Sequence, residues 1–312
     1  MKISDKIYLA GHRGLVGSAI LRRLGAKGYT NIVARSHAEL DLERQAAVEA
    51  FFEAERPNYV ILAAAKVGGI GANSSLPAEF IYDNLAVALN VIHSSYKYGV
   101  RKLLNLGSSC IYPKMAPQPL KEEYLLSGPL EPTNEAYAIA KIAAIRLCKH
   151  YNQQYGTNFI SAMPTNLYGP GDNYDLQGSH VLPAMIRKFH EAKAAGSEVT
   201  LWGDGSPYRE FLHSDDLADA AVTLMEDFDA EDLGELINVG SQSELTIKEL
   251  AQKVAKVVGY TGPIHWDTDK PNGTPRKLMD SSRLCGLGWR PKIGLDEGIA
   301  GAYRDFVASH PS

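Results

Sequence analysis

The sequence of 312 residues lacks most features that mark secreted, membrane-bound or nucleic-acid-binding proteins. It has only three cysteines, Cys110, Cys148 and Cys285, without a C-x-x-C pair, so neither a disulfide framework nor a metal site is expected. No apolar run approaches the ~18 residues of a membrane span, and glycine breaks the first apolar stretch too early for a signal peptide. A net charge of −4 gives no reason to expect nucleic acid or a membrane surface. These absences predict a cytoplasmic protein that acts on a small molecule.

The first two thirds of the chain alternates short apolar segments with amphipathic ones, which is typical of strands alternating with helices. This order predicts a Rossmann-type α/β fold, in which a doubly wound parallel sheet binds ligands at the carboxyl ends of its strands. The expected strands are 6–10, 32–35, 59–64, 102–107 and 159–164, and the expected helices are 14–27, 44–55, 78–98 and 135–155.

The pattern changes after Pro164, where segments become shorter and richer in glycine and proline. We therefore expect an NADP-binding domain over 1–165 and a smaller, mainly substrate-binding lobe over 166–312. That lobe need not be contiguous, because 211–226 and 236–240 resemble a helix and a strand that return to the main sheet.

A glycine-rich turn, Gly11-His-Arg-Gly14-Leu-Val-Gly17, separates the first expected strand from the first expected helix. Gly11 permits a tight turn, Gly14 lets the backbone approach a pyrophosphate, and Gly17 lets the helix pack on the strand. The phosphates would lie at the helix N-terminus, where free N–H groups and the helix dipole favour anions. Because the turn lies between a strand and a helix, it predicts a dinucleotide site.

The end of the second expected strand indicates which dinucleotide binds. NAD enzymes often carry an acid there for the ribose 2′-hydroxyl, whereas an arginine accommodates a 2′-phosphate. Here the strand ends at Ala34-Arg35-Ser36, and Arg13 in the glycine turn is a second cation, so NADP is favoured. Asp41 and Leu42 follow one turn later; they are candidates to meet the adenine, or Asp41 caps the next helix.

A set of catalytic groups follows the fourth expected strand, which runs into Ser108-Ser109-Cys110. Tyr137 and Lys141, four residues apart on an amphipathic helix, share one helix face. A lysine beside a phenol lowers the pKa of that phenol. Tyr137 is therefore expected to give a proton to a carbonyl oxygen that Ser108 holds, as hydride arrives at carbon.

These residues resemble the extended branch of the short-chain dehydrogenase/reductase superfamily and, more closely, the GDP-L-fucose synthase family. That family converts GDP-4-keto-6-deoxy-D-mannose by epimerising C3 and C5 and then reducing C4 with NADPH. The strings that carry the resemblance are AGHRGLVGSA, AAAKVGGI, GSSCIYP, EPTNEAYAIAK, MPTNLYGPGDN and GTPRK.

The resemblance implies roles for residues that spacing alone leaves open. Cys110 would be the base of the epimerisation and His180 the acid on the opposite face of the sugar. On residue type alone, a lone cysteine is more often a small core residue and a lone histidine a structural one. Cys148 and Cys285 keep that reading. The cofactor contacts implied by the family are Gly11, Arg13, Gly14, Leu15, Val16, Gly17, Arg35, His37, Asp41, Leu42, Leu106, Gly107, Ser108, Lys141, Pro164, Asn166, Leu167 and His180.

The family also implies a GDP site formed by Lys188, Trp202, Arg209 and Asn272. An indole stacks on a base, and an arginine bridges phosphate or ribose. Two positions depart from close relatives. His37 stands where a second arginine often follows strand two, which weakens the preference for NADP. Pro271-Asn-Gly replaces Pro-Asp-Gly, so Asn272 would make an amide contact.

Two other functions stay open from the sequence. A UDP-hexose 4-epimerase of the same branch would need neither Cys110 nor His180, and a non-catalytic NADP-sensing regulator usually lacks the tyrosine or the lysine. The resemblance further implies a homodimer built through helices 78–98 and 135–155. Two faces buried inside one subunit would produce the same apolar pattern.

Overall fold

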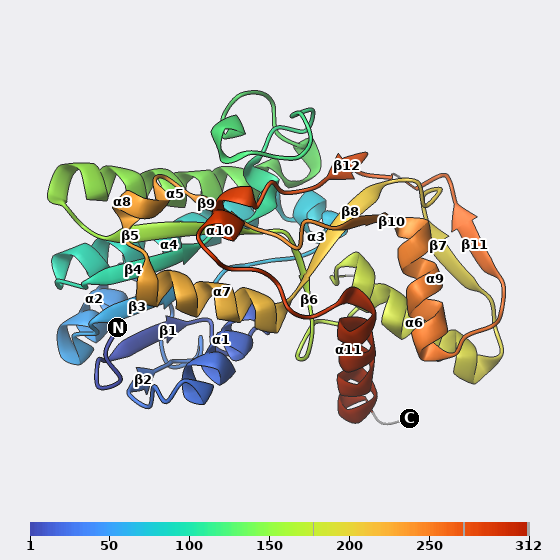
Figure 1. Cartoon of the computed structure of the whole chain (residues 1–312), viewed down its shortest axis with the longest axis horizontal. Helices are drawn as coiled ribbons and strands as arrows, with labels where there is room; N and C mark the ends of the chain where they lie inside the picture. The colour runs from blue at the N-terminus through green and yellow to red at the C-terminus, as the bar shows by residue number, and fades with distance from the viewer. Residues whose placement is uncertain (177, 271, 311–312) are drawn as a thin grey trace.

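A computed structural model describes residues 1–176, 178–270 and 272–310, so Pro271 lies outside the described residues. Its centre is a six-stranded sheet whose neighbouring strands all run parallel, in the order β2-β1-β3-β4-β5-β9 (Figure 1). The strands are β1 (Ile7–Ala10), β2 (Ile32–Val33), β3 (Tyr59–Leu62), β4 (Lys102–Leu106), β5 (Phe159–Pro164) and β9 (Ile237–Val239). The prediction of a Rossmann-type α/β fold is confirmed.

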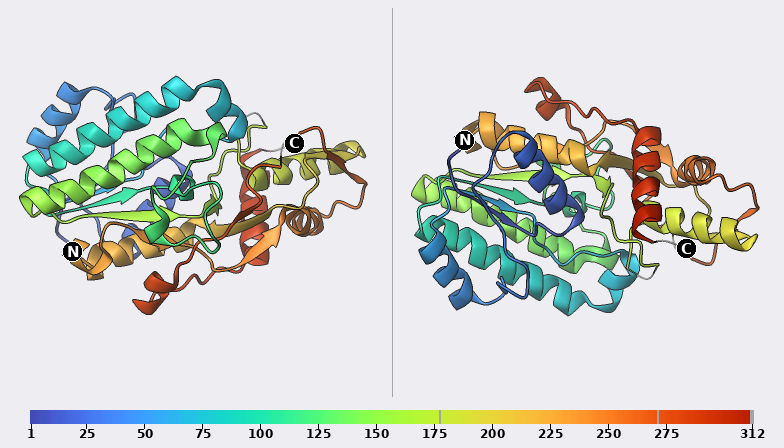
Figure 2. Two further views of the ribbon diagram at one scale, coloured as in Figure 1. Left: turned by 90° about the horizontal axis from the view of Figure 1, so that it is seen from above. Right: turned by 90° about the horizontal axis from the view of Figure 1, so that it is seen from below.

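Helices cover both faces of this sheet, which explains why its strands read as unbroken apolar runs. One face packs against α1 (Leu15–Ala26) and α7 (Ser214–Asp227). The other face packs against α2 (Gln45–Glu55), α4 (Pro77–Lys97) and α5 (Glu135–Tyr155), which lie side by side in Figure 2. The chain leaves β1 toward β2 and later crosses back to β3, so the topological switch point that binds ligands lies beside β1.

A second group of elements gathers around its own apolar core beyond the carboxyl ends of the main strands. There β8 pairs with β6, β10 and β12, and β7 pairs with β11. The elements are β6 (Asn166–Tyr168), α6 (Val181–Ala195), β7 (Val199–Trp202), β8 (Tyr208–His213), β10 (Glu244–Thr246), α9 (Ile247–Val258), β11 (Ile264–Asp267), β12 (Arg276–Lys277) and α11 (Leu295–Ser309). Short helices α3 (Ile70–Ser75), α8 (Ala230–Leu233) and α10 (Ser282–Gly286) complete the fold with the 3₁₀ turns η1 (Ser109–Ile111), η2 (Glu122–Tyr124) and η3 (Pro132–Asn134).

These two cores support a division of the chain that we propose: 1–165 with about 211–240 around the main sheet, and the rest of 166–312 mainly in the second lobe. In the region that links them, a helix was expected over 211–226. It begins instead at Ser214, because Phe211 and Leu212 complete β8 and pair with β6. The His213 side chain then accepts a hydrogen bond from the Asp215 N–H and caps α7.

The segment after β2 also differs from expectation. The strand ends at Val33 rather than at Arg35, and α2 begins at Gln45 with Arg44 as its N-cap residue. Asp41 therefore does not cap this helix. Its carboxylate accepts a hydrogen bond from the Glu43 N–H at 3.0 Å and holds the preceding turn.

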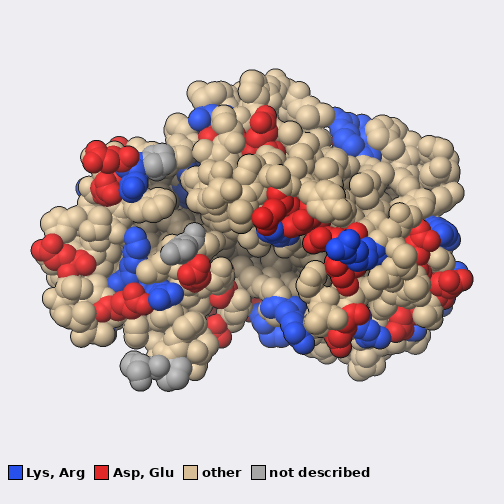
Figure 3. All heavy atoms as spheres, turned by 180° about the vertical axis from the view of Figure 1, so that it is seen from behind, with Lys and Arg blue, Asp and Glu red and all other residues tan. Residues whose placement is uncertain are grey.

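The surface carries acidic and basic side chains side by side rather than in separate fields, as Figure 3 shows for one face. This mixture agrees with the small net charge. Among the described residues, the helices are too short or too polar to cross a lipid bilayer.

One buried cation joins the sheet to α7. The Lys102 ammonium donates hydrogen bonds to the carbonyl oxygens of Leu224 at 2.8 Å, Met225 at 3.0 Å and Phe228. These carbonyls end α7, where the helix dipole favours a positive charge. Burial nevertheless lowers the pKa of Lys102, because the charged form has lost its hydration.

Replacing this lysine should destabilise the fold. Lys102→Met keeps the apolar stem but leaves buried carbonyls without a donor, which should lower the free energy of unfolding by about 2–4 kcal/mol. Urea denaturation measures the change. Lys121→Met, at an exposed site, should change stability by less than ~0.5 kcal/mol. Equal stability of the two variants would contradict the role assigned to Lys102.

Candidate active site

The glycine turn has the backbone geometry that its spacing predicts. Gly11 adopts φ of +86°, and a Cβ there would lie 2.6 Å from the Ala64 backbone nitrogen. A Cβ at Gly17 would overlap the Gly11 carbonyl, so α1 packs directly on the turn. Gly14, in contrast, is exposed at the N-cap of α1, and a Cβ there would make only an ordinary contact with the Gly11 carbonyl oxygen at 3.6 Å. Leu15 and Val16 follow in the first turn of the helix, which leaves a helix N-terminus suited to a pyrophosphate.

Charged groups of both signs lie at the end of β2. Arg35 donates to Glu55 at 2.8 Å and stands over the Phe51 ring at 5.7 Å, while Arg13 is exposed. Sequence reasoning overlooked Glu39. Hydrogen bonds from Ser36, followed by the charges of Arg35 and Arg13, hold the pKa of its carboxyl below the usual range. Glu39 therefore lies within electrostatic reach of both arginines. Its negative charge would repel another anion, such as a ribose 2′-phosphate, that binds there.

The other expected cofactor residues lie in several places near the carboxyl ends of the strands. Asn166 donates to the Glu210 carbonyl at 2.8 Å, and a Cβ at Gly107 would overlap the Met163 sulfur. Leu42 is buried in the core beside α2, whereas His37 is exposed with its Nδ1 3.9 Å from Asp41. Leu106 and Pro164 are the last residues of β4 and β5, and Leu167 lies within β6.

The catalytic groups meet where β4 and α5 adjoin. Ser108 ends the extended backbone after β4, and its Oγ accepts from the Cys110 N–H at 3.4 Å. Lys141 is buried, lies with its Nζ 5.7 Å from the Tyr137 ring centroid, and donates to the Leu106 carbonyl at 2.9 Å. One turn of helix and one strand end thus bring together the three groups that the sequence singled out.

The pKa of the Tyr137 phenol is raised, whereas the sequence predicted that Lys141 would lower it. Burial and the nearby Cys110 raise the pKa of the phenol, and a hydrogen bond with Ser108 opposes this only partly. Lys141 directs its proton to a backbone carbonyl, and burial lowers its own pKa to about 8. Tyr137 is therefore protonated near neutrality, which is the state that a proton donor requires.

Lys277 is a further cation at the site that sequence reasoning did not single out. It lies in β12, directly paired with Arg209 of β8. Burial raises the pKa of the Cys110 thiol, and the Lys277 charge is the largest effect in the opposite direction. The same charge adds to the lowering of the His180 pKa. The GTPRK string contains this lysine, so the motif pointed to it even though charge type and spacing did not.

His180 is the N-cap residue of α6 and is exposed. The surrounding protein atoms lower the pKa of its imidazole first, and the Lys277 charge lowers it further. Its loop rests on the motif between β3 and α3. The Gly69 N–H donates to the Gly178 carbonyl at 3.1 Å, and a Cβ at Gly69 would lie 2.9 Å from the Ser179 oxygen. Any larger side chain at Gly69 would therefore displace the segment that carries His180.

The four expected GDP-binding residues lie on the second lobe. Lys188 donates to the Thr200 carbonyl at 3.0 Å, and the Trp202 side chain is 57% exposed at the end of β7. Arg209 is half-buried, which lowers the pKa of its guanidinium. Asn272 accepts from the Asp204 N–H at 2.9 Å, so its amide oxygen already holds the turn after β7.

Cys148 and Cys285 have the structural placement expected of them. Cys148 is buried in the core between α4, α5 and the sheet. Cys285 is half-buried on α10. Neither lies with Ser108, Tyr137 and Lys141, whereas Cys110 does.

Comparison with known proteins shows which family has a similar sequence and fold. Residues 7–240 match the NAD dependent epimerase/dehydratase family. The chain is 62% identical over 304 residues to a probable GDP-L-fucose synthase 1 of Oryza sativa subsp. japonica, covering 97% of this chain and 92% of that protein. It is 52% identical to the GDP-L-fucose synthase of Escherichia coli K12, covering 97% of each.

Solved structures agree with these relatives. MlghC, a GDP-mannoheptose C4 reductase from Campylobacter jejuni with NADP bound, is 42% identical and superposes with a TM-score of 0.90 over 98% of this chain and 99% of its own. The matches span the glycine turn, the catalytic helix and the second lobe together. The chain belongs to the NAD dependent epimerase/dehydratase family and, within it, to the GDP-L-fucose synthases.

Proposed function

We propose that this protein converts GDP-4-keto-6-deoxy-D-mannose to GDP-L-fucose by epimerising C3 and C5 and then reducing C4 with NADPH. The observation that carries the proposal is the presence of a thiol and an imidazole, Cys110 and His180, beside a Ser–Tyr–Lys site, with Lys277 acting on both. A reductase or a 4-epimerase needs only the Ser–Tyr–Lys groups. The relatives named above support the same substrate class.

The reduction step follows from the protonation state of Tyr137. Bound NADPH would supply the hydride to C4. The protonated phenol then gives its proton to the C4 oxygen, while Ser108 donates a hydrogen bond to that oxygen. Lys141, anchored on the Leu106 carbonyl, stabilises the phenolate that remains.

The epimerisation step needs a base and an acid on opposite faces of the sugar. Hydrogens at C3 and C5 are acidic because each lies beside the C4 ketone. Cys110, as a thiolate, removes one of them, and protonated His180 returns a proton from the other face; the lowered pKa of the imidazole makes its protonated form a stronger acid. The Lys277 charge favours the thiolate, and it also favours the enolate that forms between the two transfers. A regulator that only senses NADP would need none of these groups.

The GDP moiety would lie on the second lobe. Trp202 presents an exposed indole on which a guanine can stack, and Lys188 and Arg209 supply positive charge for the phosphates. Asn272 holds the turn after β7 and offers the nucleotide only its amide nitrogen. Binding across both lobes would place the keto sugar at the carboxyl ends of the main strands.

The protein would also act as a homodimer through α4 and α5. Large apolar side chains recur every seven residues along the outer face of α4, at Tyr82, Leu89 and Tyr96, with exposed fractions of 64%, 50% and 36%. Ile139 and Tyr155 are exposed on the adjacent α5. The inner faces of both helices already pack on the sheet, so this outer stripe suits a second copy of the same pair of helices.

Three free cysteines support the expected reducing, cytoplasmic location.

A charge in the stripe should separate the dimer. Leu89→Glu would place two carboxylates within the interface and should shift the protein to monomers in sedimentation-velocity experiments. Val307→Glu, at an apolar site on α11 that is 42% exposed, should leave the dimer intact. A dimer that withstands Leu89→Glu would remove the stripe as its interface.

Cofactor preference should follow the charges at the end of β2. Arg13→Ala and Arg35→Ala should each weaken NADPH by roughly 3- to 10-fold and NADH hardly at all, because only NADPH carries the 2′-phosphate and the sites are partly screened by water. Glu39→Gln should tighten NADPH, since it removes an opposing anion. Fluorescence titration with both cofactors measures these changes. Equal losses for NADPH and NADH would place the arginines on the shared pyrophosphate.

The two chemistries should separate in paired variants. Without NADPH, the wild type should exchange hydrogen at C3 and C5 with D₂O, as followed by proton NMR. Cys110→Ser should lose this exchange, because a hydroxyl is far less acidic than a thiol. Tyr137→Phe should keep the exchange but lose NADPH oxidation by ~10²–10⁴-fold. If Cys110→Ser exchanges these hydrogens at the wild-type rate, Cys110 is not the base and is only a packed core residue.

A further inference from the structure

Two epimerisations by one thiol and one imidazole require both groups to regain their starting protonation states between the two events. This requirement rests on the function proposed above. In the first event, a C–H bond breaks and an S–H bond forms on Cys110, while an N–H bond of His180 breaks and a new C–H bond forms. Cys110 is then a neutral thiol and His180 a neutral imidazole. The second event needs a thiolate and an imidazolium again. One proton must therefore leave Cys110, and one must reach His180, between the two events.

The two groups have unequal access to water. His180 is exposed at the N-terminus of α6, so solvent can protonate it directly. Cys110 is only 5% exposed, and a bound sugar would cover the side that faces Tyr137. The thiol therefore needs another route for its proton.

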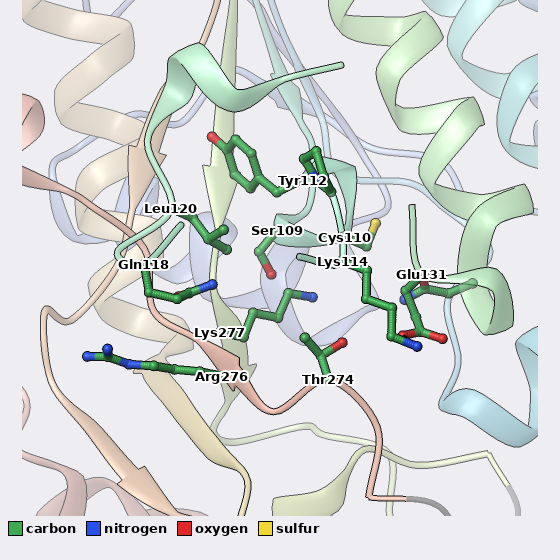
Figure 4. A pocket seen from close by; sticks show the side chains of 12 residues that line it. Ser109, Cys110, Tyr112, Lys114, Gln118, Leu120, Glu131, Thr274, Arg276 and Lys277 are labelled. Carbon is green, nitrogen blue, oxygen red and sulfur yellow. The ribbon is translucent and has the colours of Figure 1, made fainter. Parts of the chain in front are cut away.

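Cys110 lines a small cavity that has several polar side chains in its wall, and Tyr137 is not one of its lining residues. Its volume is about 30 Å³, and a single water needs roughly 10–15 Å³, so one or two waters fit. Figure 4 shows Ser109, Gln118 and Lys277 directed toward its centre, while the charged ends of Lys114 and Glu131 meet at one side. The lining runs from the buried Cys110 to Lys114, whose side chain is 40% exposed. The lining therefore includes both Cys110 and a side chain that reaches the protein surface.

The polar groups of the cavity suit bound water. Asn134 also lines it, and its buried Oδ1 has no hydrogen-bond partner among the described residues. Such an atom is costly unless water satisfies it. Glu131 pairs with Lys114 at 2.9 Å, and its side chain is 17% exposed. Burial raises the pKa of Glu131, but the contacts with Lys114 and Thr133 outweigh it, so the carboxylate is ionised and can accept a proton.

We infer that this cavity is the proton exit of Cys110 and that Glu131 relays the proton to solvent. The S–H bond of Cys110 breaks as its proton passes to a cavity water, which gives a proton to the Glu131 carboxylate. Glu131 releases it to bulk water beside Lys114 and returns to its anionic form. The thiolate that remains is held by the Lys277 charge, ready for the second carbon. Glu131 is a positioning and relay residue and does not touch the sugar carbons.

The test is rapid-quench measurement of deuterium entry at C3 and C5 of the keto sugar in D₂O, with the full-length protein and no NADPH. With enzyme in excess over sugar, the wild type should exchange both hydrogens of each bound sugar. Glu131→Gln keeps the shape but not the proton acceptor. It should exchange the first hydrogen of each bound sugar at the wild-type rate and the second at least about 10-fold more slowly. The singly exchanged sugar should accumulate.

Matched variants separate a relay from a structural effect. Glu123→Gln, an exposed carboxylate on η2, should behave as wild type. Asn134→Leu, which makes the cavity lining apolar, should show the same burst as Glu131→Gln. Formate, a small carboxylate, should restore the slow phase of Glu131→Gln, because it can replace the missing acceptor. A distortion of the site would not respond to formate.

The outcomes distinguish this inference from the proposed function. If the wild type exchanges neither hydrogen, the epimerase function is wrong. If the wild type exchanges both and Glu131→Gln does so at the same rate without a burst, only the proton exit is overturned. A slow phase in Glu131→Gln that formate leaves unchanged overturns it as well.

Discussion

The buried carboxylate of Glu210 connects the two halves of the site. This side chain is fully buried on β8, and it accepts hydrogen bonds from the Met279 N–H at 2.9 Å and the Gln242 N–H at 2.7 Å. Burial raises the pKa of its carboxyl, and these backbone donors oppose that shift. Through them one carboxylate holds the chain that follows β12 and the turn before β10 against β8. Its own backbone carbonyl accepts from the Thr165 hydroxyl at 3.4 Å, directly after β5 of the main sheet, and from Asn166 of β6, so the two lobes share one hydrogen-bonded joint.

This joint determines where the charges of the active site lie. Arg209 precedes Glu210 on β8, and Lys277 stands opposite Arg209 on β12. The pairing places a positive charge beside the Cys110 thiol, where it opposes in part the rise in pKa that burial causes. It also places two cations near each other: burial lowers the pKa of Lys277, and the charge of Arg209 lowers it further. An anionic substrate would relieve that repulsion, which gives the second lobe an electrostatic preference for a nucleotide sugar.

The same site contains groups whose environments favour opposite roles. Tyr137 is protonated and can act only as an acid, whereas the thiol of Cys110 lies under a positive charge that favours its anion. His180 reaches solvent, and Cys110 does not. Two reactions can therefore share one ketone without sharing proton donors. The alternatives raised from the sequence, a 4-epimerase and an NADP sensor, give no reason for this asymmetry.

The sequence by itself determined the Rossmann fold, because an apolar strand, a glycine turn and an amphipathic helix are local patterns that each predict one structure. It also determined that Tyr137 and Lys141 share a helix face, since their spacing matches the helical period. The edges of elements were less certain: Phe211 and Leu212 belong to β8 because they pair with a strand more than forty residues away. Asp41 is not the cap of α2 for a local reason, because its carboxylate accepts a hydrogen bond within the turn that precedes the helix. Only the tertiary structure decided the electrostatics. The nearness of Glu39 to Arg13, the placement of Lys277 beside Cys110 and the burial that raises the pKa of Tyr137 all depend on contacts between distant segments. The pKa values follow burial and neighbouring charges rather than residue type.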